Sequence, residues 1–199
     1  MESLDSLSPA AWLRWWSRAF WQQADASWHH LAWFQLPESQ RSSLVIKSPQ
    51  AVLTLLELTP GLPYEPDERL LVLASLNPQQ RMILLALVAE VCQRGSGALR
   101  LEDARLVWCE RLTRGLRPGV WLPAGLDFAR SPEASALCLL RPLFVPTAWQ
   151  RLRLSFPHAA VTLSETLMPE EPAPPQNRLL ALWDGAVWQA RQHSFMPND

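Results

Sequence analysis

The sequence predicts a mainly α fold: a single globular helical domain, with two short strands near residues 150–167 as an open alternative. Apolar residues recur at spacings of three and four along most of the chain, which is the period of an amphipathic helix. Proline follows Ser or Asn at several segment starts, and this pair is favoured at the N-cap and first turn of a helix. These starts are Ser8-Pro9, Ser48-Pro49, Asn77-Pro78 and Ser131-Pro132.

Length and composition fit one folded domain of generous size or two small ones. The chain has 199 residues, 48% of them apolar, and a formal net charge of -1. This is enough to bury a core without disulfides or metals, and it argues against disorder. A nearly neutral chain lacks the basic surface that counterion release requires, so we expect no nucleic-acid partner.

The first part of the chain predicts three helices. Residues 9–23 form the first, because Trp12, Trp16 and Phe20 share one face. A shorter helix is expected over residues 26–34, and Pro37 ends it. Residues 49–58 form a third helix, and the Pro- and Gly-rich residues 59–63 form a turn.

The most apolar part of the chain predicts two core helices, over residues 67–76 and 78–94. Asn77 and Gln80 have the spacing of a capping box at the start of the second. A further amphipathic helix is expected over residues 101–114, and Gly115 should stop it.

The remainder of the chain is less regular. Residues 117–130 read as an ordered loop anchored by Trp121 and Phe128, and residues 132–140 as a short helix. Between residues 147 and 156 helical and strand periods compete, and residues 161–167 allow a second short strand.

Three regions follow along the chain: a helical globular domain over residues 1–168, a Pro-rich linker over residues 169–176 and a C-terminal helix over residues 177–199. Asn177 is expected to cap that helix, whose apolar face includes Trp183 and Trp188. We expect the helix to dock on the body, with attachment to a partner as the alternative.

Cysteine usage and the start of the chain indicate the compartment. Cys92, Cys109 and Cys138 are odd in number and widely spaced, which is not a disulfide framework and suits a reducing cytosol. Residues 1–7 lack a basic stretch, so no secretory signal is expected. No apolar run approaches the roughly 20 residues that span a bilayer, so we expect no membrane insertion.

No residue pattern points to catalysis, a metal or a cofactor, so we expect a protein that is not an enzyme. His29 and His30 are adjacent and face different sides of a helix, and the histidines look badly placed to act together. The acidic pairs at residues 67–68 and 102–103 sit at predicted helix starts, where they complement the helix dipole. The sequence therefore offers no catalytic, cofactor-binding or metal-binding residues.

Tryptophan is the unusual feature, with 11 residues in the chain. Core packing explains each tryptophan taken singly better than a surface does. However, the first helix is apolar over more than half of its circumference, and aromatic residues beside arginines are typical of interface anchors. The candidate partner contacts are Trp12, Trp15, Trp16, Trp21, Trp183 and Trp188. A membrane-surface role would require a more basic polar face than this helix has.

Two segments resemble a known family. Residues 148–157 (AWQRLRLSFP) and residues 76–80 (LNPQQ) with the apolar helix that follows are similar to the cytosolic sorting-platform accessory subunits of bacterial type III secretion systems, the YscK/OrgA/HrpD-like family. The tryptophan-rich residues 11–16 look like the short members of this family. Together these segments cover about a third of the chain.

The resemblance implies a helical, non-enzymatic adaptor in the cytoplasm, at the cytosolic face of the inner membrane when assembled. Its partners would be the cytoplasmic domain of an inner-membrane ring protein and a C-ring-like pod protein of the secretion apparatus. One alternative is a type III secretion chaperone or regulator that binds an amphipathic segment of a partner. Another is an enzyme of unrecognised type.

Overall fold

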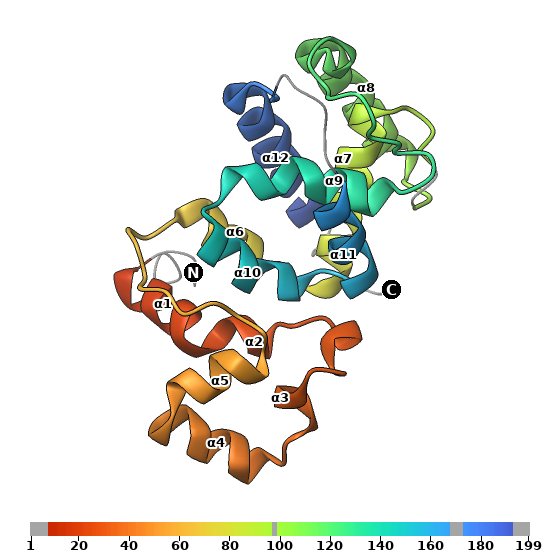
Figure 1. The fold of residues 1–199 in the computed structure, drawn as a ribbon. Helices are drawn as coiled ribbons and strands as arrows, with labels where there is room; N and C mark the ends of the chain where they lie inside the picture. Colours follow the sequence, from red (N-terminus) through yellow and green to blue (C-terminus); the bar gives the residue numbers. More distant parts are fainter. Residues whose placement is uncertain (1–7, 97–98, 168–172, 193–199) are drawn as a thin grey trace, which may run out of the picture. The chain divides into compact units, whose positions relative to one another are not determined.

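The computed structural model describes residues 8–96, 99–167 and 173–192, and these residues form helices and loops without a strand (Figure 1). The predicted mainly α fold is confirmed. The described residues gather into two compact units: unit 1 contains residues 8–75 and 145–159, and unit 2 contains residues 76–144 and 160–192. The chain passes between the two units three times, at residues 75–76, 144–145 and 159–160.

The predicted strands at residues 150–167 are wrong. This stretch forms α10 (Pro146–Leu152), a 3-10 turn (Arg153–Ser155) and α11 (His158–Thr166). Leu152, Leu154 and Phe156 are all buried, because the change from α-helix to 3-10 turn directs them inward without a pleated strand. The alternation of leucines was therefore a misleading signal.

A continuous helix opens unit 1, as predicted for residues 9–23. It comprises α1 (Pro9–Arg14), a π-helical turn (Trp15–Ala19) and α2 (Phe20–Gln22). The Ser8 hydroxyl accepts a hydrogen bond from the Ala11 N–H at 3.1 Å, so the predicted cap is present. The single helix predicted over residues 26–34 is instead a 3-10 turn (Ala26–Trp28) followed by α3 (Ala32–Gln35).

Three further helices complete the first part of unit 1. The helix α4 (Glu38–Lys47) was not predicted, because its first residues are polar and its apolar residues lie only at its end. It is followed by α5 (Pro49–Leu55) and α6 (Glu68–Ser75). No residue of α4 is buried, although the helix packs against α5 (Figure 1).

Unit 2 is built around α7 (Pro78–Cys92). The predicted capping box is present: the Asn77 side chain accepts from the Gln80 N–H at 2.8 Å, and the Asn77 N–H donates to the Gln80 side chain at 3.0 Å. Residues 83–89 are all buried. The helices packed on α7 are α8 (Asp103–Leu116), α9 (Pro132–Leu140) and α12 (Gln176–Arg191) (Figure 1).

The ends of α8 and α12 differ from the prediction. Gly115 does not stop α8, which continues to Leu116 and ends at Arg117 in the left-handed conformation with φ 50°. Asn177 does not cap α12, because the helix begins one residue earlier with Pro175 as its N-cap. Residues 168–172, which include the first half of the linker predicted over residues 169–176, and the chain end beyond residue 192 lie outside the described residues.

The loop of residues 117–130 contains one 3-10 turn, Pro118–Val120. Its two predicted anchors hold it in different ways. Phe128 is buried, and its N–H donates to the Gln93 side chain at 3.2 Å. Trp121 is half-buried, and its indole N–H donates to the Leu116 carbonyl at 2.8 Å.

Candidate protein-binding grooves

Five of the six tryptophans proposed as partner contacts lie in the interior, which corrects the expectation that they are surface anchors. Only Trp188, on the outer face of α12, is exposed, at 58%. The others are 9% exposed or less: Trp12, Trp15, Trp16, Trp21 and Trp183. Aromatic spacing along a helix could not separate these two environments, because a core face and an interface face have the same period.

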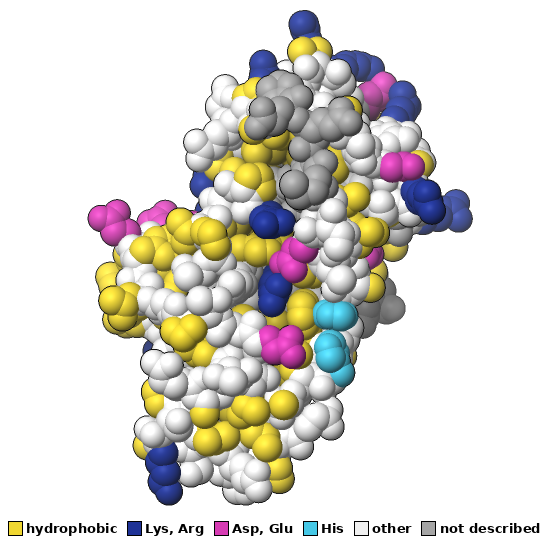
Figure 2. All heavy atoms as spheres, viewed as in Figure 1, with side chains coloured by type: hydrophobic (Ala, Val, Ile, Leu, Met, Phe, Trp, Pro, Cys, Tyr) yellow, Lys and Arg dark blue, Asp and Glu magenta, His cyan; other side chains and the backbone are white. Residues whose placement is uncertain are grey.

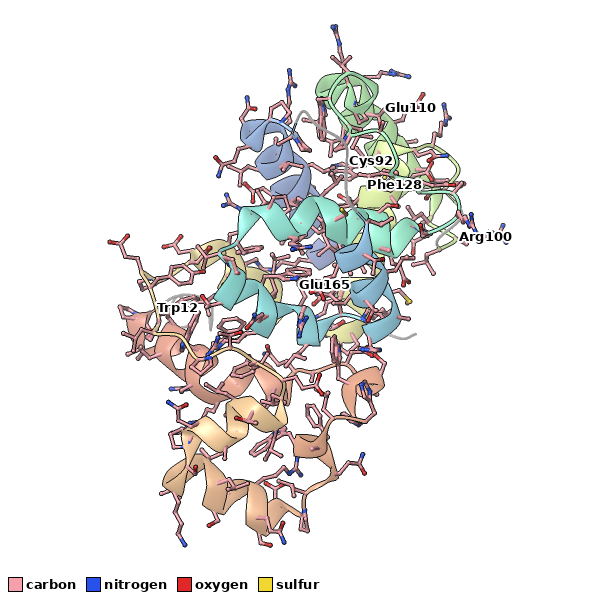
Figure 3. The ribbon with its side chains drawn as sticks, in the orientation of Figure 1. Trp12, Cys92, Arg100, Glu110, Phe128 and Glu165 are labelled. Carbon is pink, nitrogen blue, oxygen red and sulfur yellow. The ribbon has the colours of Figure 1, made fainter. Side chains whose placement is uncertain are left out.

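The buried tryptophans of the first helix form an aromatic cluster, and Figure 3 labels one of them, Trp12. The ring centroid of Trp12 lies 5.5 Å from that of Trp16 and 5.1 Å from that of Tyr64. The Trp12 indole N–H donates to the Tyr64 carbonyl at 3.0 Å. Burial and the nearby Asp67 carboxylate raise the pKa of the Tyr64 hydroxyl to about 12. These side chains hold the helix in place and are therefore structural.

Unit 1 has an open cavity of about 590 Å³, which we call the α4 groove. Its walls come from the end of the first helix, from α3 and from α4. The apolar lining includes Trp21, Trp33, Phe34, Val45 and Ile46. The volume falls within the range of about 300–1,000 Å³ that is common for ligand sites. Figure 2 shows hydrophobic side chains exposed over this part of the molecule.

Charged side chains stand among the apolar lining of the α4 groove. They are Arg18, Arg41 and Glu38. Arg41 and Glu38 form an ion pair at 2.6 Å. Arg18 is exposed and forms no ion pair with a described residue. The groove therefore combines an aromatic lining with an excess of positive charge.

Unit 2 has a separate cavity of about 840 Å³, which we call the α8 groove. Its apolar lining includes Leu99, Leu106 and Val107, and Val107 is 47% exposed. The charged lining includes Arg94, Arg100, Arg114, Glu90, Asp103 and Glu110. Glu110 pairs with Arg114 at 2.7 Å and with Arg94 at 3.8 Å, while Arg100 extends outward (Figure 3). This groove is balanced in charge.

The structure also brings together two histidines that the sequence separates by more than a hundred residues. The ring centroids of His30 and His158 are 4.7 Å apart, so the expectation that the histidines are badly placed to act together is wrong for this pair. Trp28 packs on His158 with centroids 4.5 Å apart. The Nδ1 atom of His30 donates to the Ser27 carbonyl at 2.9 Å, since that oxygen can only accept. Figure 2 shows histidine side chains gathered on this face.

The cysteines are free thiols. Burial raises the pKa of Cys92 and Cys138, and burial together with the nearby Glu90 carboxylate raises the pKa of Cys109 to about 12. A thiol with so high a pKa is almost entirely protonated near neutral pH, whereas a reactive cysteine requires the thiolate. These side chains therefore serve the core as small apolar residues.

The described ranges hold neither a cluster of metal ligands nor a helix that could span a membrane by itself. No three His, Cys, Asp or Glu side chains there are grouped in a way that could hold a metal ion. No single helix of these ranges is long and apolar enough to cross a membrane, although α6 and α7 taken together have the length and composition. In comparison with known proteins, no family model, curated protein or solved structure matches this chain.

Proposed function

We propose that this chain is an adaptor that joins two protein partners, one in the groove of each unit. The observation that carries the proposal is that unit 1 and unit 2 each have their own open, partly apolar groove. A linking protein needs two separate partner sites, and apolar surface that stays open on a folded protein is typical of interaction sites. Aromatic and arginine side chains are also enriched among the residues that dominate binding energy.

The resemblance to the type III secretion accessory subunits supplies the proposed setting. We propose that the partners are the cytoplasmic domain of the inner-membrane ring protein and the C-ring-like pod protein, met at the cytosolic face of the inner membrane. Within the similar segment of residues 148–157, Trp149 and Arg151 are buried. A similarity carried by buried residues fits a shared fold better than a shared contact surface, so it leaves the partner contacts to the grooves.

Affinity capture from the native bacterium tests the proposal, with one substitution in each groove. Ile46 is 82% exposed and Val107 is 47% exposed, so Ile46→Asp and Val107→Asp should leave the fold intact. The wild-type chain should recover the ring protein and the pod protein. Each variant should lose one of these partners and keep the other.

Matched controls come from exposed apolar residues outside the grooves. Leu62 in unit 1 is 89% exposed and Val120 in unit 2 is 83% exposed. Leu62→Asp and Val120→Asp should recover both partners. Recovery of one secreted protein instead of ring and pod proteins would contradict the adaptor and support the chaperone.

A further inference from the structure

We infer that the α4 groove binds an acidic amphipathic helix of a partner protein. This inference rests on the proposed function and names the chemistry of the occupant at one of its two sites. Three properties of the groove favour such a ligand: the incomplete burial of α4, the excess of positive charge and the concave form of the surface.

The helix α4 lacks a complete packing layer. None of its ten residues is buried, and the apolar Leu44 and Val45 are only half-buried while Ile46 is 82% exposed. A helix with an apolar side normally buries it against a second element, and helix-on-helix packing is the solution in an all-helical fold. An additional helix in the groove would cover Val45 and Ile46 on one side and Phe34 on the other.

The lining favours a helix over an extended peptide. Peptides that bind as strands pair with an open sheet edge, and the described part of unit 1 contains no strand. Helical ligands instead place apolar anchors at positions i, i+3 or i+4, and i+7 in a groove. The accessible apolar surface for such anchors comes from Phe34, Val45 and Ile46, because Trp21 and Trp33 are only 9% and 1% exposed.

The positive charge of the groove determines which side chains are favoured on the polar side of the bound helix. Glu38 already pairs with Arg41 at 2.6 Å, which leaves Arg18 without an ion pair among the described residues. Acidic side chains on the ligand would neutralise this excess, whereas basic ones would be repelled. Two buried donors of the lining also lack an acceptor among the described residues, the Nε1 of Trp33 and the Nε of Arg41.

The concave form of the groove suits a helical ligand better than a membrane surface. An anionic bilayer would also attract arginines, but it is a broad surface that cannot enter a cavity of about 590 Å³ between helices. A single amphipathic helix presents side chains that reach into such a cavity. The groove therefore fits a protein ligand better than a lipid surface.

Binding of synthetic peptides to the full chain tests the inference by fluorescence anisotropy. The probe is an amphipathic helix of about 18 residues with leucine anchors and glutamates on its polar side, and the comparison peptide has lysine at every glutamate. The glutamate peptide should bind at least about tenfold more tightly than the lysine peptide. Raising salt from about 50 mM to about 500 mM should narrow this difference, because screening weakens exposed charge pairs.

Variants locate the binding in the groove. Ile46→Asp should weaken the binding of the glutamate peptide by about tenfold or more. Arg18→Glu should weaken the binding of the glutamate peptide severalfold and strengthen the binding of the lysine peptide. The matched controls are Leu62→Asp and Arg14→Glu, which change exposed residues outside the groove lining. Both should bind like the wild type.

Three results would overturn the inference: equal binding of both peptides, binding that Ile46→Asp does not alter, or no binding of either peptide. Vesicles of anionic phospholipid serve as a further probe, and vesicle binding that is lost in Ile46→Asp would assign the groove to a membrane instead. If neither peptide binds but Ile46→Asp still abolishes capture of a secretion-apparatus protein, the proposed adaptor function stands. Only the inference that the ligand is an acidic helix is then wrong.

Discussion

The guanidinium carbon of Arg151 lies 4.1 Å from the centroid of the Trp16 ring, in the interior of unit 1. The Arg151 Nε donates to the Trp16 carbonyl at 3.3 Å, and NH1 donates to the Thr147 carbonyl at 3.0 Å. Burial lowers the pKa of Arg151 to about 10, because the charged form loses hydration. Ring and carbonyl contacts, without a carboxylate among the described residues, thus stabilise this cation and join α10 to the first helix.

Removing this side chain should destabilise the fold. Arg151→Ala leaves two carbonyl oxygens without their donor and the Trp16 face uncovered, so we expect a loss of about 3 kcal/mol in the free energy of unfolding. Arg151→Lys keeps a charge but cannot reproduce the planar fork, and should cost about 1–2 kcal/mol. Urea unfolding followed by circular dichroism measures both changes.

The control for this series is Arg14→Ala. Arg14 is an exposed arginine of the same first helix, so its substitution should change the free energy of unfolding by no more than about 0.5 kcal/mol. An Arg151→Ala variant as stable as Arg14→Ala would show that the buried contacts with Trp16 make no net contribution.

Helices whose starts carry a local signal could be predicted from the sequence. Asn77 and Pro78 begin α7 with the predicted capping box, and α9 has the predicted bounds of residues 132–140. Such signals are local, since a cap and a proline at the first turn act on the nearest backbone groups. The mainly α fold class follows from the same signals repeated along the chain.

The candidate site could not be predicted in the same way. The α4 groove is lined by residues between Arg18 and Ile46, on three separate segments, and α4 follows Pro37 without a side-chain capping hydrogen bond. The pairing of His30 with His158 is set by tertiary contacts alone. For the tryptophans, periodicity identified the shared face of Trp12 and Trp16 but could not tell whether that face was covered.

The contact between α12 and α8 should tolerate alanine but not a large side chain at Gly185. A Cβ atom there would lie 3.4 Å from the Trp108 ring and 3.6 Å from Leu112, which is ordinary contact. Gly185→Ala should therefore leave stability unchanged or raise it by up to about 1 kcal/mol, because glycine is a poor helix former. Gly185→Leu should lower stability by about 1–3 kcal/mol through overpacking.

Thermal unfolding of the two Gly185 variants checks this prediction. Gly119→Ala is a useful comparison, because a Cβ atom at Gly119 would meet nothing within 4 Å and the residue lies outside α12. A Gly185→Leu variant with wild-type stability would show that α12 does not approach α8 closely in solution.

Two substitutions near the end of α8, Arg117→Gly and Gly115→Ala, should stabilise the protein. Arg117 adopts φ 50°, a conformation that costs a residue with a Cβ atom about 1 kcal/mol and glycine almost nothing. Gly115 lies within the helix, where alanine is favoured by about 1 kcal/mol and has space around its Cβ. Arg117→Gly and Gly115→Ala should each raise the midpoint of thermal unfolding.

A β-branched substitution at the same position provides the contrast. Arg117→Val should lower the midpoint, because a β-branched residue is strained in the left-handed region. If Arg117→Gly and Arg117→Val shifted the midpoint equally, α8 would not end in the conformation seen here.

Alkaline pH should reduce stability before any arginine titrates. The folded-state pKa of Cys109 is raised from 9.0 to about 12, and burial also raises the pKa of Cys92 and Cys138. Above about pH 9 the unfolded chain loses thiol protons that the folded chain retains, so stability is fully present below that pH and declines above it. Cys109 contributes about 1.4 kcal/mol per pH unit above pH 9, and the raised pKa values of Cys92 and Cys138 act in the same direction, so we expect a total fall of about 1–4 kcal/mol between pH 8 and pH 10.

Urea unfolding under reducing conditions at these pH values measures the decline. Cys109→Ala removes one titrating thiol, so its stability should fall less steeply with pH by about 1 kcal/mol over the same range, whatever its stability at pH 8. The lowered pKa of Arg151 acts in the opposite direction, but only above about pH 10, where the unfolded chain keeps a proton that the folded chain releases. A stability that is flat from pH 8 to pH 10 would mean that the thiols are hydrated in the folded state, which is incompatible with a buried Cys109.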